Sequence, residues 1–175
     1  MPQVVVSQGS KLKETLHHGL QSLDTELGLS DKIAQKETSS ALIFIDAKLP
    51  QAPPSTTNPL LLSLVIDYVK EKGYKTIYVV PGTMWNVDQQ KTLEFLGLST
   101  LVKKKGARIL TRSELKPPYG PQAEEQNPEG KKKSEENHPH NEKIDPETVD
   151  YTVVLTQVRT DPKFGLWTSY LNLGF

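Results

Sequence analysis

The chain has 175 residues, of which 24% are charged, a formal net charge of +0 and no cysteine. This length suits one domain with a sizeable core, and a chain without cysteine holds no disulfide, thiolate metal site or cysteine-bound iron–sulfur cluster. The balanced charge favours neither nucleic acid nor a membrane surface as a partner. Because no apolar run approaches membrane-spanning length and no signal peptide is evident at the start, we expect a cytoplasmic protein.

The first part of the chain alternates apolar runs with amphipathic stretches. The β-branched residues Val4–Val6 predict an opening strand near residues 3–7. Leucines at near-helical spacing then predict a helix from Ser10 to Leu27. The continuous apolar run Ala41–Asp46 is typical of a strand that is covered on both faces, as in a parallel sheet.

The same alternation continues in the middle of the chain. Asn58 predicts the start of a helix from Pro59 to Glu71, because Asn caps free N–H groups and Pro suits the first helical position. Thr76–Val80 predicts another buried strand. Asp88–Lys104 predicts a helix that is broken near Gly97, with an acidic residue at its start, where the helix dipole favours one.

Two further strands, near residues 107–112 and 151–157, complete the predicted pattern. Strands that alternate with helices indicate an α/β layered fold, with a mainly parallel central sheet flanked by helices. We expect a single domain over residues 1–175, and no internal repeat is evident.

A polar stretch separates these last two strands. Residues 114–150 contain ten acidic residues against five lysines, and almost no large aliphatic side chains. This composition predicts a flexible, disordered insert over residues 114–149 within the domain, with high mobility through about 117–146. A solvated loop is the simpler interpretation; a partner-binding tether, or a lid that orders over a site, is the alternative.

Polar residues follow three of the predicted strands at their carboxyl ends, where ligands bind in parallel sheets. Hydroxyl groups, an amide, glycine N–H groups and a guanidinium suit an oxyanion such as phosphate or carboxylate. The simpler interpretation is that Thr and Asn cap helices and that the arginine forms a structural ion pair. The candidate ligand-binding residues are Thr56, Thr57, Asn58, Gly82, Thr83, Arg159, Thr160 and Asn172.

The remaining motifs assign no chemistry. The adjacent His17 and His18 face different sides of a predicted helix and suit surface or packing roles. The pair His138 and His140 has flexible flanks, so we expect no metal site there. The chain has no phosphate-binding glycine loop, no dinucleotide fingerprint and no nucleophile elbow. No catalytic residue or cofactor is therefore assigned, and whether the protein is an enzyme stays open.

Several segments, taken in order, resemble the domain of unknown function 362 family. They are Val4-Val-Val-Ser-Gln-Gly9, Ala41-Leu-Ile-Phe-Ile-Asp-Ala-Lys48, Ser55-Thr-Thr-Asn-Pro59, Tyr68-Val-Lys-Glu-Lys-Gly-Tyr-Lys-Thr-Ile-Tyr-Val-Val80 and the closing stretch 150–175. The resemblance covers nearly the whole chain apart from the insert, and this chain would be a short, divergent member. It implies an α/β fold and a redox neighbourhood, because relatives are often associated with ferredoxin-type iron–sulfur modules.

The residues that would form the family's site are changed in this chain. Where the family has Lys-Thr-His, this chain has Arg159-Thr160-Asp161, and Asp does not replace His as a proton carrier near neutral pH. The family's later Lys-Asn is Leu171-Asn172, and its helix-entry His is Asn58. Two functions follow: a module that binds a small anionic ligand or metabolite, with catalysis unassigned, or a non-catalytic protein-interaction subunit.

The closing stretch leads to one more expectation. Arg159 should lie beside the loops that carry Thr57 and Gly82, because the family's signature requires the last strand to end on the same sheet edge. Trp167 and Tyr170 should share one face of a short helix that packs onto the domain and holds Asn172 near the cleft.

Overall fold

A computed structural model of the protein describes residues 5–28, 39–47, 56–82, 88–116, 143–155, 159–161 and 165–167. Within these residues, four strands form an all-parallel sheet in the order β3-β2-β1-β4. The α/β fold with a parallel central sheet is therefore confirmed. The strands are β1 (Ser40–Ile45), β2 (Thr76–Pro81), β3 (Arg108–Ile109) and β4 (Tyr151–Leu155).

Four α-helices belong to the described residues: α1 (Leu12–Glu26), α3 (Pro59–Glu71), α4 (Gln89–Phe95) and α5 (Leu98–Lys104). The start of α3 is as predicted, because the Asn58 side chain accepts a hydrogen bond from the N–H of Leu60 at 2.9 Å. The predicted break between α4 and α5 is also confirmed. Gly97 has a φ of 67°, a left-handed conformation that glycine adopts without strain.

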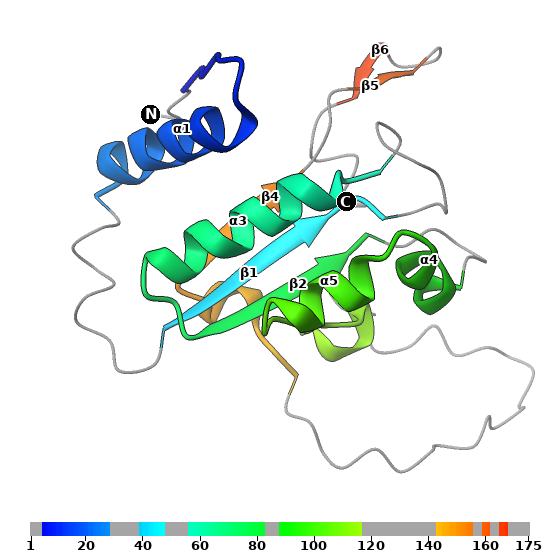
Figure 1. Ribbon diagram of the computed structural model, residues 1–175. Coiled ribbons are helices and arrows are strands. Elements are labelled where there is room, and N and C mark those ends of the chain that lie inside the picture. Colours follow the sequence, from blue (N-terminus) through cyan, green and yellow to red (C-terminus); the bar gives the residue numbers. More distant parts are fainter. Residues whose placement is uncertain are drawn as a thin grey trace, which may run out of the picture.

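The helices α3 and α5 lie on one face of the sheet, in front of the strands in Figure 1. This helix-covered face contains Ala41, Ile43 and Ile45 of β1, packed with buried residues of α3, α4 and α5. The alternate side chains point to the opposite face, called here the second face. The buried residues of the second face are Leu42, Val80, Leu110 and Leu115, and the partly buried Ile144 and Val149 pack against them.

The predicted opening strand is wrong for the part that the structure describes. Residues 5–9 have no strand structure, and Val6 is 89% exposed. The Ser7 hydroxyl donates a hydrogen bond to the backbone carbonyl of Thr15 at 2.9 Å, so the segment lies against α1 instead. Strand propensity depends strongly on tertiary context, and here the contact with α1 takes the place of strand pairing.

The predicted insert is too long at both ends. Leu115 and Ile144 form a parallel bridge, in which the N–H of Ile144 donates to the Glu114 carbonyl at 2.8 Å and the N–H of Lys116 donates to the Ile144 carbonyl at 2.9 Å. Leu115 is 1% exposed, because its aliphatic side chain fills the second face. The short 3₁₀ helices η1 (Arg112–Glu114) and η2 (Pro146–Thr148) flank this bridge. Residues 117–142 lie outside the described residues.

The predicted helix near Trp167 is also wrong. Strands β5 (Arg159–Asp161) and β6 (Gly165–Trp167) pair antiparallel as a separate two-stranded sheet, which lies apart from the main sheet (Figure 1). A three-residue connection favours such a hairpin, and Thr, Leu and Trp fit strands well. Tyr170 lies outside the described residues. No helix in the described part of the chain is long and apolar enough to cross a membrane.

Candidate functional site

The strand order reverses between β1 and β4. From β1 the chain passes through α3 to β2 on one side, whereas β4 pairs with β1 on the other side. Their last residues, Ile45 and Leu155, are register partners. In open parallel sheets, ligands bind outside the carboxyl ends of the strands where the strand order reverses in this way. We call the ends of β1, β2 and β4, together with the start of α3, the carboxyl edge.

Thr57 joins three elements at the carboxyl edge. Its N–H donates to the Asp46 carbonyl at 2.7 Å, and its hydroxyl oxygen accepts from the Asp46 N–H at 2.8 Å. The same hydroxyl donates to the Leu155 carbonyl at 3.4 Å. Thr57 is 2% exposed and directly precedes the cap of α3. Its polar groups therefore hold the ends of β1 and β4 against the start of the helix.

The other described candidates at this edge also bond within the fold. The side chain of Asn58 caps α3 through Leu60 at 2.9 Å, and the N–H of Gly82 donates to the Ile45 carbonyl at 2.7 Å. Thr56 is fully buried. The structure thus brings Thr56, Thr57, Asn58 and Gly82 to one edge, as the sequence predicted, but the polar groups of Thr57, Asn58 and Gly82 bond within the fold.

The remaining candidates are placed only in part. Arg159 and Thr160 belong to β5 of the separate hairpin, and the positions of their side chains are not described. The expectation that Arg159 lies beside Thr57 and Gly82 therefore stays a prediction. Thr83 and Asn172 lie outside the described residues.

The electrostatics of the carboxyl edge combine two opposing contributions. Backbone N–H groups at the start of a helix attract negative charge, which favours an anion near the first turn of α3. Asp46 is 3% exposed and, through its backbone, contacts Thr57, so a carboxylate lies close to the same edge. An anionic ligand at this edge therefore requires a cation, and Arg159 is the candidate that the sequence supplies.

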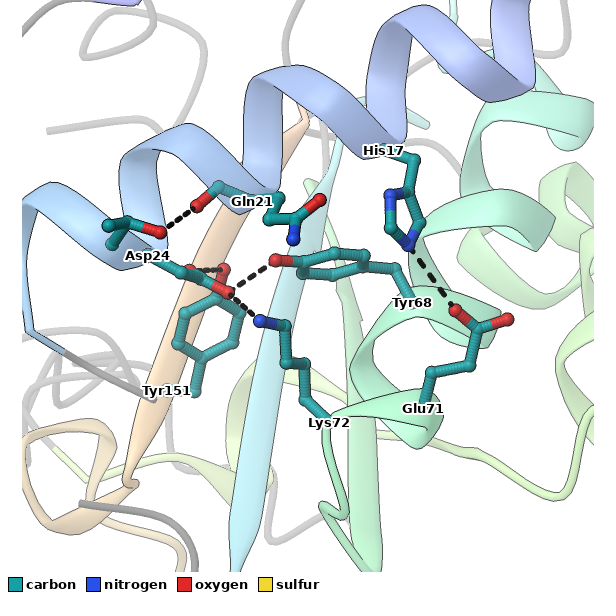
Figure 2. Close-up of polar contacts among 8 residues, drawn as sticks. His17, Gln21, Asp24, Tyr68, Glu71, Lys72 and Tyr151 are labelled. Carbon is teal, nitrogen blue, oxygen red and sulfur yellow. Dashed lines mark hydrogen bonds and ion pairs between the residues drawn. The ribbon is translucent and has the colours of Figure 1, made fainter. Parts of the chain in front are cut away.

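A second polar group, which the sequence did not predict, lies at the opposite end of the sheet (Figure 2). Asp24 of α1 is 2% exposed and accepts hydrogen bonds from the hydroxyls of Tyr68 on α3 and Tyr151 on β4, the latter at 2.9 Å. The Lys72 ammonium lies 3.4 Å from the Asp24 carboxylate and 5.3 Å from the centre of the Tyr68 ring. Tyr74 stacks on Tyr151, with ring centres 5.2 Å apart. We call these five residues the Asp24 cluster.

The pKa values of the three tyrosines in the Asp24 cluster are raised. Burial, then the hydrogen bond to Asp24, raises the pKa of Tyr68 well above its ordinary value. Burial, followed by the charge of Asp24, also raises the pKa of Tyr151, and burial with the charges of Asp24 and Asp150 raises the pKa of Tyr74 to about 12. All three phenols are therefore neutral at physiological pH, and two of them donate hydrogen bonds to the carboxylate.

The surroundings of the Asp24 cluster give it a structural role. The cavity beside it, between α1 and α3, holds about 20 Å³ and is lined in part by His17, Tyr68 and Glu71. That volume accommodates about one water molecule, which is too small for a substrate. His17 lies edge-on to Tyr68, and its Nε2 is 3.6 Å from the Glu71 carboxylate. The cluster thus holds α1 on α3 and β4.

The sequence contained one signal for this cluster. Asp24 follows Leu16 and Leu20 at helical spacing and therefore lies on the apolar side of α1. It is the one residue of α1 that is buried, whereas Leu16 and Leu20 are partly buried. An acidic residue on an apolar helix face requires partners, but the sequence gave no indication of which residues they were.

The residues placed by the structure contain no group of three or more His, Cys, Asp or Glu side chains that could hold a metal ion. Comparison of the chain with protein-family models, curated proteins and solved structures found no match. The resemblance to the domain of unknown function 362 family therefore stays an expectation that rests on the sequence motifs.

Proposed function

We propose that the protein binds a small anionic ligand or metabolite, one that carries a phosphate or carboxylate group, at the carboxyl edge of its sheet. The observation that carries this proposal is the strand order β3-β2-β1-β4, which creates a reversal between β1 and β4. Parallel sheets bind their ligands at such reversals. Catalysis is not assigned.

The described residues have distinct roles in this proposal. Thr57 and Gly82 fix the ends of β1, β2 and β4 through hydrogen bonds to Asp46, Leu155 and Ile45. Asn58 fixes the first turn of α3, whose dipole favours an anion. Arg159 supplies the cation that offsets the nearby Asp46 carboxylate. Thr83, Thr160 and Asn172 supply hydroxyl and amide groups for the ligand.

A titration of the full chain with inorganic phosphate and with citrate tests the proposal. The amide NMR signals of Thr57, Asn58 and Gly82 should shift at the lowest ligand concentrations, and these shifts should reach a plateau as the site fills. In Arg159→Ala the shifts should no longer reach a plateau. Lys103→Ala is the matched control, because Lys103 is an exposed cation in the last turn of α5. Shifts that survive in Arg159→Ala, or that also disappear in Lys103→Ala, would contradict the assigned site.

The alternative is a non-catalytic protein-interaction subunit that kept the fold and lost the site chemistry. One observation favours it: the polar groups of Thr57, Asn58 and Gly82 bond within the fold. The resemblance noted above would make a redox protein the partner. An absence of phosphate and citrate binding, together with a complex formed with a ferredoxin-type protein, would support this alternative over ligand binding.

A further inference from the structure

The four described α-helices leave one side of the sheet without an α-helix. Buried residues of α3, α4 and α5, and partly buried leucines of α1, all pack on the helix-covered face. The second face is covered near β1, β2 and β3 by Leu110 and Leu115, with Ile144 and Val149 beside them. Parallel sheets are stable when both faces are covered, so the rest of the second face is the part that needs a cover.

The part of the second face over β4 is exposed. Thr152 and Val154 are register partners of Leu42 and Phe44, so they point to the second face. Thr152 is exposed and Val154 is 37% exposed, whereas Leu42 is completely buried. We call Thr152 and Val154 the outer strip. It follows the edge strand of the sheet and ends beside Leu155, at the carboxyl edge.

The segments between the described elements differ in the parts of the sheet that they join. Residues 48–55 lead to α3 and residues 83–87 lead to α4, both on the helix-covered face. Residues 29–38 lead from α1 to the start of β1. Residues 117–142 begin and end at the second face, but they contain no Leu, Ile, Val, Phe, Met or Trp. Such a segment offers little apolar surface to bury.

The C-terminal segment 168–175 has the apolar composition and the length that are needed to cover the outer strip. It carries Tyr170, Leu171, Leu173 and Phe175 within eight residues. Extended, those residues span about 26 Å at about 3.3 Å per residue, against about 17 Å for the five residues of β4. The chain leaves β4 at Leu155, next to the outer strip, and reaches residue 168 after the β5–β6 hairpin.

We infer that residues 168–175 dock on the second face of the sheet along the outer strip, and that this segment completes the cover of β4. Val154 contacts the aliphatic and aromatic side chains of the segment, and the segment carries Asn172 towards the carboxyl edge. The docking is a property of the fold and does not depend on whether the carboxyl edge binds an anion.

A nitroxide attached through Ser169→Cys tests this inference in the full chain, because the protein has no other cysteine. Ser169 is polar, so the label leaves the apolar side chains of the segment unchanged. The amide signals of Thr152 and Val154 should lose most of their intensity, whereas those of Lys103 and Lys104 on α5 should keep theirs. A Val154→Asp substitution in the labelled protein should restore the signals of β4.

Three results would overturn the inference. The first is full intensity at Thr152 and Val154, and the second is equal loss on β4 and α5. The third is a loss that disappears when the labelled protein is diluted with unlabelled protein, which would assign the outer strip to a second copy of the chain. Circular dichroism of the Val154→Asp variant checks that it is folded, which we expect because Val154 is already partly exposed. A phosphate titration of the same labelled protein reports separately on the ligand site.

Discussion

The two ends of the sheet use polar side chains in different ways. At the amino end, the charged carboxylate of Asp24 joins α1, α3 and β4 through two phenols and an ammonium. At the carboxyl end, the neutral hydroxyl of Thr57 joins β1, α3 and β4 through backbone groups. Both arrangements hold β4, which among the described strands pairs with β1 and lies at the edge of the main sheet.

The difference lies in what is lost when each polar group is removed. A buried charge is costly unless all its partners are present, so a change in the Asp24 cluster leaves charged and polar groups without compensation. A buried hydroxyl that bonds to backbone groups leaves one or two neutral groups unsatisfied, at a smaller cost. The amino end should therefore contribute more to stability, which leaves the carboxyl end better able to change with a ligand.

The largest expected effect is that of Asp24→Ala. This substitution leaves the hydroxyls of Tyr68 and Tyr151 and the ammonium of Lys72 without their common acceptor, and it should lower the free energy of unfolding by about 3 kcal/mol. Urea denaturation measures the change. The matched control is Glu26→Ala, an exposed acidic residue at the end of the same helix, which should change stability by less than about 0.5 kcal/mol.

Asp24→Asn separates the charge from the hydrogen bonds. The amide oxygen still accepts from one tyrosine, whereas the attraction to Lys72 is lost. The loss of stability should therefore lie between those of Glu26→Ala and Asp24→Ala. Equal stability of Asp24→Ala and the wild-type protein would mean that the cluster does not hold α1.

A smaller effect is expected for Thr57→Val at the carboxyl edge. Valine has nearly the same shape but cannot accept from the Asp46 N–H or donate to the Leu155 carbonyl, so the free energy of unfolding should fall by about 2 kcal/mol. Hydrogen exchange at the end of β4 should become faster. The control is Thr76→Val, at an exposed position of β2. Thr57→Ser should keep most of the stability, and an equal loss in Thr57→Ser and Thr57→Val would show that packing is responsible instead.

The sequence predicted those parts of the fold that depend on local signals. The Asn58-Pro59 pair marks the start of α3 because capping involves neighbours in the chain, and the apolar runs of β1 and β2 require burial on both faces. The glycine between α4 and α5 is equally local. Residues 5–9 could not be predicted in this way, because a β-branched run forms a strand only where tertiary contacts pair it with the sheet, and here Ser7 contacts α1 instead.

The candidate site was predicted in position and not in detail. The ends of the predicted strands indicated where Thr57 and Gly82 lie, but the direction of their polar groups depends on how β4 pairs with β1. The Asp24 cluster was hidden for the same reason. Asp24 is separated from Tyr68 by 44 positions and from Tyr151 by 127, and no local pattern predicts contacts between residues that far apart.

The smallest expected effect is that of Tyr151→Phe, which removes a single hydroxyl at the amino end of the sheet. Asp24 keeps Tyr68 and Lys72 as partners, so the free energy of unfolding at neutral pH should fall by about 1 kcal/mol. In an Asp24→Ala background the same substitution should have almost no effect, because the acceptor is already gone. Additive losses in the double variant would show that the two residues are not coupled.

The pH dependence gives a second measurement on the same variant. The folded protein holds the pKa of Tyr151 above its ordinary value of 10.0 and that of Tyr74 at about 12. Above pH 10 the unfolded chain therefore loses phenolic protons that the folded protein keeps, and stability should fall as the pH rises from about 10 towards 12. Urea denaturation between pH 8 and pH 11 should show a shallower decline in Tyr151→Phe, because one of the shifted phenols is absent. An identical slope in both proteins would mean that Tyr151 ionises equally in the folded and unfolded states, and that Asp24 and burial do not hold its proton.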